Sequence, residues 1–76
     1  MDILVVNETL HRATQLYYRF VRQYEIPVSM LQKHRREVRY GEYTICFVSK
    51  AQLDIYLRGR RNAKLIHGPD LEARLS

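Results

Sequence analysis

Four consecutive aliphatic residues, Ile3-Leu4-Val5-Val6, stand almost at the start of this 76-residue chain. Three of the four are β-branched, which favours a strand, and the run shows no alternation with polar residues. A strand of this kind must be covered on both of its faces, because it has no polar side to turn toward water. The sequence therefore predicts a strand over residues 3–6 that lies in the centre of its sheet.

An amphipathic helix is predicted directly after this strand. Asn7 is expected as its N-cap, with Glu8 favourably placed in the first turn. Apolar residues share one face over an arc of roughly 140°: Leu10, Ala13, Leu16, Tyr17, Phe20, Val21 and Tyr24. Polar and basic residues occupy the opposite face: His11, Arg12, Gln15, Arg19, Arg22 and Gln23. Because Pro27 pushes Ile26 out of helical conformation, the helix is expected to end before it.

Two further segments match a helical capping box. Ser29–Gln32 predicts one or two helical turns that continue through His34. Ser49–Gln52 predicts a short helix over about residues 50–58, and Gly59 is expected to end it. At the end of the chain, AKLIHG indicates a last short strand, and GPDLEARL indicates a terminal helical turn that begins at a proline.

The segment HRREVRYGEYTICFV, His34 to Val48, is predicted to form a hairpin. Gly41-Glu42 fits a two-residue turn, and this register pairs Tyr40 with Tyr43. One face is apolar and is expected in the core: Val38, Tyr40, Tyr43, Ile45 and Phe47. The other face carries Arg35, Glu37, Arg39, Thr44, Cys46 and Val48. The core aromatics and the basic side chains of this segment therefore point in opposite directions.

The predicted order is β-α-β-β-α-β with a short C-terminal helical turn, in one small basic α/β domain over residues 1–76. We expect an α+β fold, a two-layer sandwich in which the strand-helix-strand unit over residues 44–66 is parallel. This order resembles ferredoxin-like domains and, among them, the RNA-recognition motif. ILVVNETL resembles the first-strand motif of that family, and GEYTICFVS lies where its third-strand motif would be.

The resemblance to the RNA-recognition motif implies base stacking on exposed aromatic residues of the central strands. The first strand has no aromatic residue, and exposing Tyr43 and Phe47 would turn Glu37 into the core. Burying such a group without a partner costs about 1–3 kcal/mol. We therefore retain the topology and reject this stacking mechanism.

A second resemblance implies an alternative fold, the winged helix-turn-helix. VRYGEYTICFVSKAQLDIYL, Val38 to Leu57, resembles the wing and following helix of excisionase-like proteins, which bend DNA. The pattern is a basic strand, a glycine turn, an apolar strand, a capped start and a Leu-x-x-Tyr-Leu helix. The aliphatic strand at residues 3–6 favours the α+β fold, so the winged helix ranks second.

The positive charge of the chain is concentrated in its second half. The net charge is +5, and residues 33–64 hold nine cations against three acids, whereas residues 1–32 sum to zero. If the basic segments share one face, they would contact the phosphates of a nucleic acid: Lys33, Arg35, Arg36, Arg39, Arg58, Arg60, Arg61 and Lys64. A solvated basic face without a partner is the equally weighted alternative.

The protein class that competes with nucleic-acid binding is a small adaptor or inhibitor, of the kind that phages and viruses encode, docking on an acidic protein surface. Tyrosine is enriched at such interfaces, and Tyr18 and Tyr56 are the candidates. The terminal LEARL helix could also pack on a second copy, so a homodimer stays an alternative.

Catalytic signatures are missing from the sequence. The three glycines are isolated, so there is no phosphate-binding loop, and Cys46 has no histidine at metal-ligand spacing. A general acid–base pair of His67 and Asp70 is a minor alternative. We expect no enzymatic activity, no cofactor and no metal. A single cysteine, with no signal peptide and no long apolar run, favours a cytoplasmic protein without membrane contact.

Overall fold

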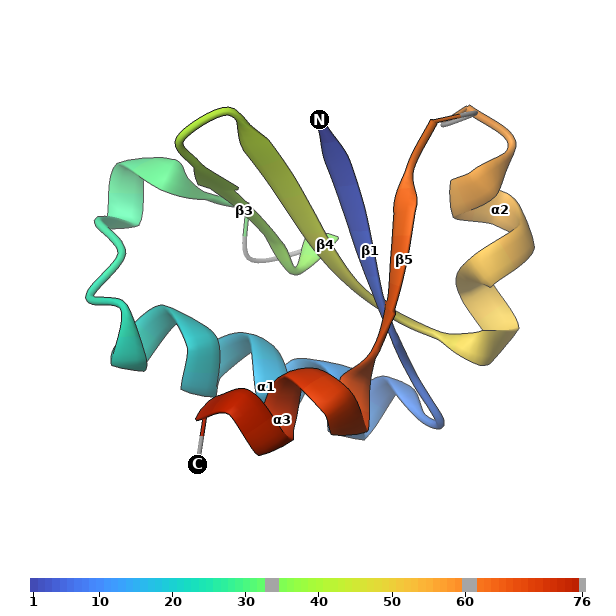
Figure 1. The fold of residues 1–76 in the computed structure, drawn as a ribbon, viewed down its shortest axis with the longest axis horizontal. Helices are drawn as coiled ribbons and strands as arrows, with labels where there is room; N and C mark the ends of the chain where they lie inside the picture. Colours follow the sequence, from blue (N-terminus) through green and yellow to red (C-terminus); the bar gives the residue numbers. More distant parts are fainter. Residues whose placement is uncertain (33–34, 60–61, 76) are drawn as a thin grey trace.

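The computed structural model describes residues 1–32, 35–59 and 62–75. Its elements follow one another in the order shown in Figure 1: β1 (Asp2–Asn7), α1 (Leu10–Gln23), the 3-10 turn η1 (Val28–Met30), β2 (Leu31–Gln32), β3 (Glu37–Tyr40), β4 (Tyr43–Ser49), the 3-10 turn η3 (Lys50–Gln52), α2 (Leu53–Leu57), β5 (Lys64–His67) and α3 (Gly68–Leu75). The predicted short helix is thus present as η3 and α2, and the terminal helix as α3. The chain is a small α+β domain.

The strands form one mixed sheet in the order β2-β3-β4-β1-β5. β1 is parallel to both of its neighbours, β4 and β5. β3 is antiparallel to β2 and to β4. The aliphatic strand therefore lies inside the sheet, as predicted. The predicted parallel relation between the two ends of the strand-helix-strand unit is also confirmed, with β1 lying between β4 and β5.

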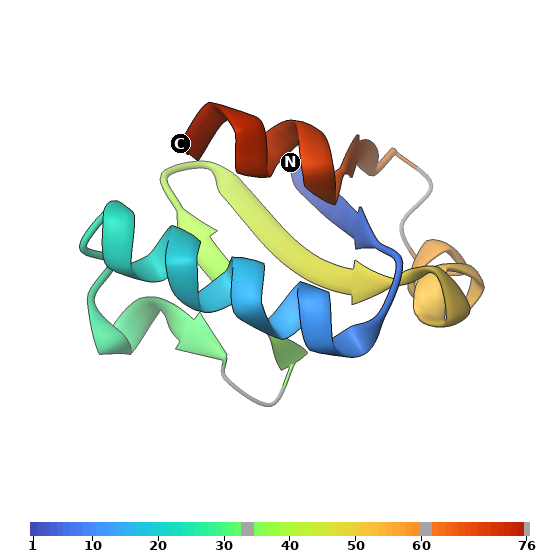
Figure 2. The same ribbon diagram turned by 90° about the horizontal axis from the view of Figure 1, so that it is seen from below.

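The two faces of β1 contribute to two separate apolar clusters. Val5 faces α1 and joins the larger cluster, to which α3 adds Leu75. Leu4 and Val6 face the other way, and α2 packs against them through Leu53 and other residues. Figure 2 shows α1 and α3 side by side across one face of the sheet. The predicted two-layer sandwich is therefore wrong, because a strand that is apolar on both faces needs a helix on each.

The N-cap of α1 is Thr9, and the prediction of Asn7 is wrong. Thr9 Oγ1 accepts a hydrogen bond from the backbone N of Arg12 at 3.1 Å. Asn7 still belongs to β1, where pairing with Ser49 extends the strand one residue beyond the aliphatic run. The helix ends at Gln23, before Pro27, as predicted.

The helical turns predicted from Ser29 are wrong beyond one 3-10 turn. η1 ends at Met30, and Leu31 then pairs with Val38 as part of β2. Pairing with the apolar face of the hairpin outweighs the weak local preference for a helix. His34 lies outside the described residues.

The predicted hairpin register is confirmed. Tyr40 pairs with Tyr43, and Gly41 has a φ of 61°, a value that glycine adopts readily. Tyr40 and Tyr43 are 45% and 43% exposed, however, so their assignment to the core is wrong. They close the hairpin at the end of the sheet, where Phe20 of α1 and its C-cap residue Tyr24 contact the ring of Tyr40.

The winged helix-turn-helix would require two linked helices before the hairpin. In the structure, α1 is followed by η1 and by β2, which adds a strand to the sheet. The order of elements before the hairpin is thus that of an α+β sheet and differs from the winged-helix alternative.

Candidate nucleic-acid interface

The exposed face of α1 carries three arginines in one row. Arg12, Arg19 and Arg22 are all exposed, and at 100° per residue they lie within an arc of about 80°. With a rise of 1.5 Å per residue, the row spans about 15 Å of helix. The opposite face of α1 is held on the sheet by its buried residues, Ala13, Leu16, Tyr17 and Phe20. Packing of this face fixes the arginines on the outside of the molecule.

Polar and aromatic side chains lie between these arginines. Gln15 and Tyr18, together with Arg19 and Arg22, line a shallow hollow on the surface of α1. Tyr18 is 50% exposed, and its ring contacts that of Tyr17 edge-on at 5.2 Å. The first of the two predicted interface tyrosines therefore borders the arginine row.

Arg36 reaches the same surface from the sheet. Its Nε atom donates a hydrogen bond to Thr14 Oγ1 at 2.7 Å, and the Thr14 hydroxyl in turn donates to the carbonyl of Leu10 at 2.9 Å. Thr14 lies one helical turn from Tyr18, so Arg36 flanks the arginine row. Arg35 precedes it and is exposed. We call this set the α1 basic surface: Arg12, Gln15, Tyr18, Arg19, Arg22, Arg35 and Arg36.

Acidic residues at the border of this surface have cationic partners. Glu72 of α3 lies 3.6 Å from Arg19, and Glu8 lies 2.7 Å from Lys50. The hydrogen bond from Lys50 and its charge lower the pKa of the Glu8 carboxyl below its usual value, with a smaller effect from Arg12. Both carboxylates are thus at least partly neutralised, which leaves the outer face of α1 with an excess of positive charge.

Three other predicted cations lie near the end of the sheet at which β1 begins, which we call its amino edge. Arg39 pairs with Thr44 on β4, and Lys64 pairs with Ile3 on β1. Arg58 follows α2, which runs back toward the edge at which β5 starts (Figure 1). Arg39 and Lys64 are separated by three strand spacings, or roughly 14 Å of sheet. The strand registers also show that Arg39 and Lys64 lie on opposite faces of the sheet.

The structure therefore divides the predicted basic residues. Arg36 contacts α1 through Thr14, with Arg35 next to it in the chain, whereas Arg39, Arg58 and Lys64 form a separate, more dispersed group that we call the amino-edge group. The other predicted residues, Lys33, Arg60 and Arg61, lie outside the described residues.

The sequence interpretation missed Arg12, Arg19 and Arg22 because it summed charge over residues 1–32. The acids that cancel them in that sum lie elsewhere or are paired: Asp2 is in β1, Glu25 follows α1 with a φ of 50°, and Glu8 borders the surface in its ion pair with Lys50. The sequence already placed these arginines on the polar face of the helix, and their spacing of seven and three residues was the signal that could have marked them as binding candidates.

The remaining candidates of the sequence lie away from this surface. Tyr56, the second interface tyrosine, packs against the smaller apolar cluster beneath α2. Cys46 is buried, and its Sγ lies 3.1 Å from Glu37 Oε1. His67 and Asp70 line a groove of about 230 Å³ between β5 and α3. In the described part of the chain, no three His, Cys, Asp or Glu side chains gather as metal ligands.

Comparisons with protein-family models, with curated proteins and with solved structures find no match to this chain. The ferredoxin-like order thus has no structural neighbour to support it. Within residues 1–32, 35–59 and 62–75, no helix has the length and apolar character that crossing a membrane requires.

Proposed function

We propose that this protein is a small non-enzymatic nucleic-acid-binding module that contacts phosphates through the α1 basic surface. The observation that carries the proposal is the row of Arg12, Arg19 and Arg22 on the outer face of α1. Arg36, held by Thr14, widens the row on one side. Planar guanidinium groups bind phosphate oxygens in a bidentate manner, so a row of them is suited to a phosphate backbone.

This mode of binding gives affinity with little reading of base sequence, because phosphate contacts position a protein without reporting the bases. Each neutralised phosphate releases condensed counterions. For four arginine contacts on duplex DNA, the logarithm of the binding constant should fall with the logarithm of the salt concentration with a slope of about −3.6.

The experiment is a fluorescence anisotropy titration with labelled duplex DNA and with single-stranded RNA, between about 50 and about 200 mM salt. The double variant Arg12→Gln/Arg22→Gln should reduce the magnitude of the duplex slope by roughly 1.8. The matched control, Arg39→Gln/Arg58→Gln, removes the same charge from the amino-edge group and should leave most of the slope in place. A flat wild-type slope would rule out phosphate binding. If the control loses more of the slope than Arg12→Gln/Arg22→Gln does, phosphate binding belongs to the amino-edge group.

A protein interface on the same surface is the second candidate function, favoured by the exposed ring of Tyr18 among arginines. Tyrosine and arginine are the residues that dominate many interface hot spots, and the positive charge would select an acidic partner. Affinity capture from lysate with and without nuclease separates the two functions. A partner that survives nuclease treatment and is lost in Tyr18→Ala favours the adaptor function.

A further inference from the structure

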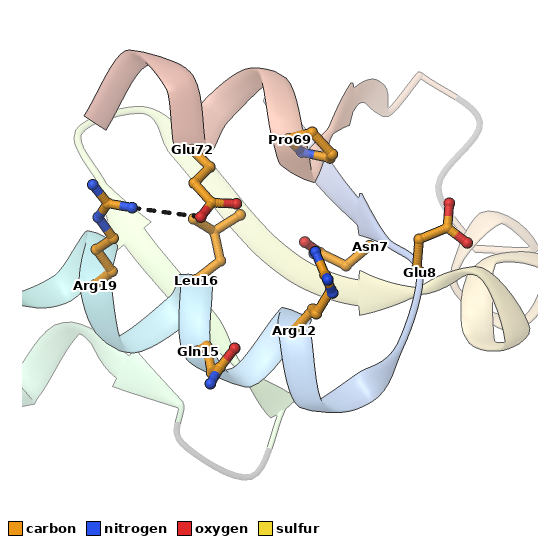
Figure 3. Close-up of a pocket in the computed structure, with 8 residues that line it drawn as sticks. All are labelled: Asn7, Glu8, Arg12, Gln15, Leu16, Arg19, Pro69 and Glu72. Atoms are coloured by element: carbon orange, nitrogen blue, oxygen red, sulfur yellow. Dashed lines mark ion pairs between the residues drawn. The ribbon is translucent and has the colours of Figure 1, made fainter. Parts of the chain in front are cut away.

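A hollow of about 260 Å³ lies between α1 and α3 at the carboxyl end of β1 (Figure 3). Its lining comes from the end of β1 and from both helices: Asn7, Glu8, Arg12, Gln15, Leu16, Arg19, Pro69 and Glu72. Ligands of open sheets with parallel strands bind outside the carboxyl ends of those strands, and this hollow lies at such an end, where β1 leads into α1 and the parallel strand β5 leads into α3.

The floor of the hollow is polar and rigid. Asn7 is only 5% exposed, and its Nδ2 donates to the carbonyls of Val5 and Val48 at 3.2 and 3.4 Å. Gly68, at the start of α3, leaves room for this side chain, because a Cβ there would overlap Asn7 Oδ1. The position of Asn7 is thus set before any ligand arrives, which lowers the ordering cost of binding.

The wall formed by α1 supplies the hydrogen-bond donors. Arg12 and Gln15 lie one turn apart, and Figure 3 shows Arg12 beside Asn7 at one end of the hollow. At the other end, Arg19 lies in its ion pair with Glu72. Glu8 is paired with Lys50, and among the described residues Arg12 has no ion pair. The guanidinium of Arg12 is therefore the group best placed to accept an anion.

We propose that this hollow binds a single phosphate monoester, of the kind that ends a nucleic-acid strand. The Arg12 guanidinium would donate to two phosphate oxygens and the Gln15 amide to a third. A monoester carries about −1.5 to −2 charges, more than an internal phosphodiester, so a guanidinium without an ion pair among the described residues favours it. This site rests on the proposed function, because Arg12 and Arg19 belong both to the hollow and to the α1 basic surface on which the strand would lie.

The test compares single-stranded oligonucleotides of one sequence with a 5′-phosphate, a 3′-phosphate or two terminal hydroxyls. We expect the strand with the matching terminal phosphate to bind about tenfold more tightly than the hydroxyl strand. Arg12→Gln should abolish this preference and, because Arg12 also belongs to the α1 basic surface, should weaken binding of the hydroxyl strand by about the same factor as Arg22→Gln. The control, Arg22→Gln, lies on the same helix outside the hollow and should weaken all three by the same factor.

Inorganic phosphate serves as a second probe and separates a strand end from a free phosphate as the source. If it shifts the amide NMR signals of Arg12 and Gln15 and competes away only the terminal preference, a strand end is the ligand. If it shifts these signals but the three strands bind equally, the same chemistry binds a free phosphate and the strand-end assignment is wrong. Equal binding of the three strands without any phosphate-induced shift would overturn the site. The salt dependence of the hydroxyl strand would still test the proposed function separately.

Discussion

Arg36 Nε donates a hydrogen bond to Thr14 Oγ1 over 2.7 Å, and this contact ties the residue before β3 to the second turn of α1. The backbone of Arg36 is left-handed, with a φ of 50°. Such a conformation is uncommon for residues other than glycine, asparagine and aspartate, so surrounding contacts must hold it. The hydrogen bond to Thr14 is one such contact, and it directs the guanidinium toward the arginine row of α1.

Replacing Arg36 and replacing Thr14 should lower stability to a similar extent but should affect DNA binding differently. Arg36→Gln and Thr14→Val should each lower the free energy of unfolding by about 1 kcal/mol. Only Arg36→Gln removes a charge, and it should reduce the salt slope for duplex DNA by about 0.9. Urea denaturation and anisotropy titrations measure the two quantities. The double variant should be no less stable than the worse single variant; additive losses would show that the bond does not couple the residues.

Tyr17→Phe should stabilise the protein. The Tyr17 hydroxyl is buried and has no hydrogen-bond partner within the described residues, while its ring packs edge-on against Phe47 at 5.8 Å. Phenylalanine keeps the ring and removes the orphaned group, so we expect a gain of about 1 kcal/mol in the free energy of unfolding. Tyr18→Phe, at a half-exposed position, is the control and should change little. A loss of stability in Tyr17→Phe would indicate that the hydroxyl has a partner.

The same hydroxyl should make the protein less stable at alkaline pH. Burial raises the pKa of Tyr17 above its usual value, with a smaller effect from Tyr18. The unfolded chain then releases the proton at lower pH than the folded one, so stability is unaffected below about pH 10 and falls as pH rises through the raised pKa. Urea midpoints at about pH 8 and about pH 11 should differ less in Tyr17→Phe than in the wild type.

The Glu8–Lys50 pair should be visible in the titration of one carboxyl. Lys50 lowers the pKa of Glu8 from its ordinary value of 4.5, so the pair contributes stability above that pH and loses it as pH falls through the lowered pKa. Lys50→Met should return the Glu8 midpoint, followed by carbon NMR, toward 4.5. Lys64→Met removes a distant charge and should leave it unchanged. An equal effect of both variants would indicate long-range charge and not this contact.

Gly68→Ala should destabilise the protein by about 1–3 kcal/mol, because its Cβ would overlap Asn7 Oδ1. Gly59→Ala is the matched control: nothing lies within 4 Å of a Cβ there, and the change should be neutral or stabilising by about 0.4–1 kcal/mol. Thermal melts measure both variants. Adding Asn7→Ala to Gly68→Ala should cost less than the sum of the two single changes. Strict additivity would contradict the overlap.

Much of the fold could be predicted because its signals are local. The central position of β1 follows from four aliphatic residues in succession, and the buried face of α1 follows from its helical period. The hairpin register follows from Gly41-Glu42. Each signal depends on a few neighbouring residues and on backbone geometry that is the same in every protein. The N-cap was misplaced by two residues, because pairing of Asn7 with Ser49 decides where β1 ends.

The candidate site was predicted less well, because charge was summed along the chain and not across the surface. The sum over residues 1–32 cancelled the arginines of α1 against Asp2, Glu8 and Glu25, although Asp2 lies in β1, Glu25 follows the helix and Glu8 pairs with Lys50. Arg36 was a candidate, yet its contact with Thr14 joins residues 22 positions apart. Such a contact depends on how β3 and α1 pack, which no local pattern encodes.

By itself, the sequence determined a central strand, a helix with one apolar face, a hairpin in register and a basic chain. These follow from period, turn chemistry and composition, which act over a few residues. Only the tertiary structure decided which helices cover each face of the sheet and that the basic residues form two groups. It also placed the hollow at the end of β1 beside Arg12. Those features require packing between distant elements, where burial of apolar surface chooses the partners.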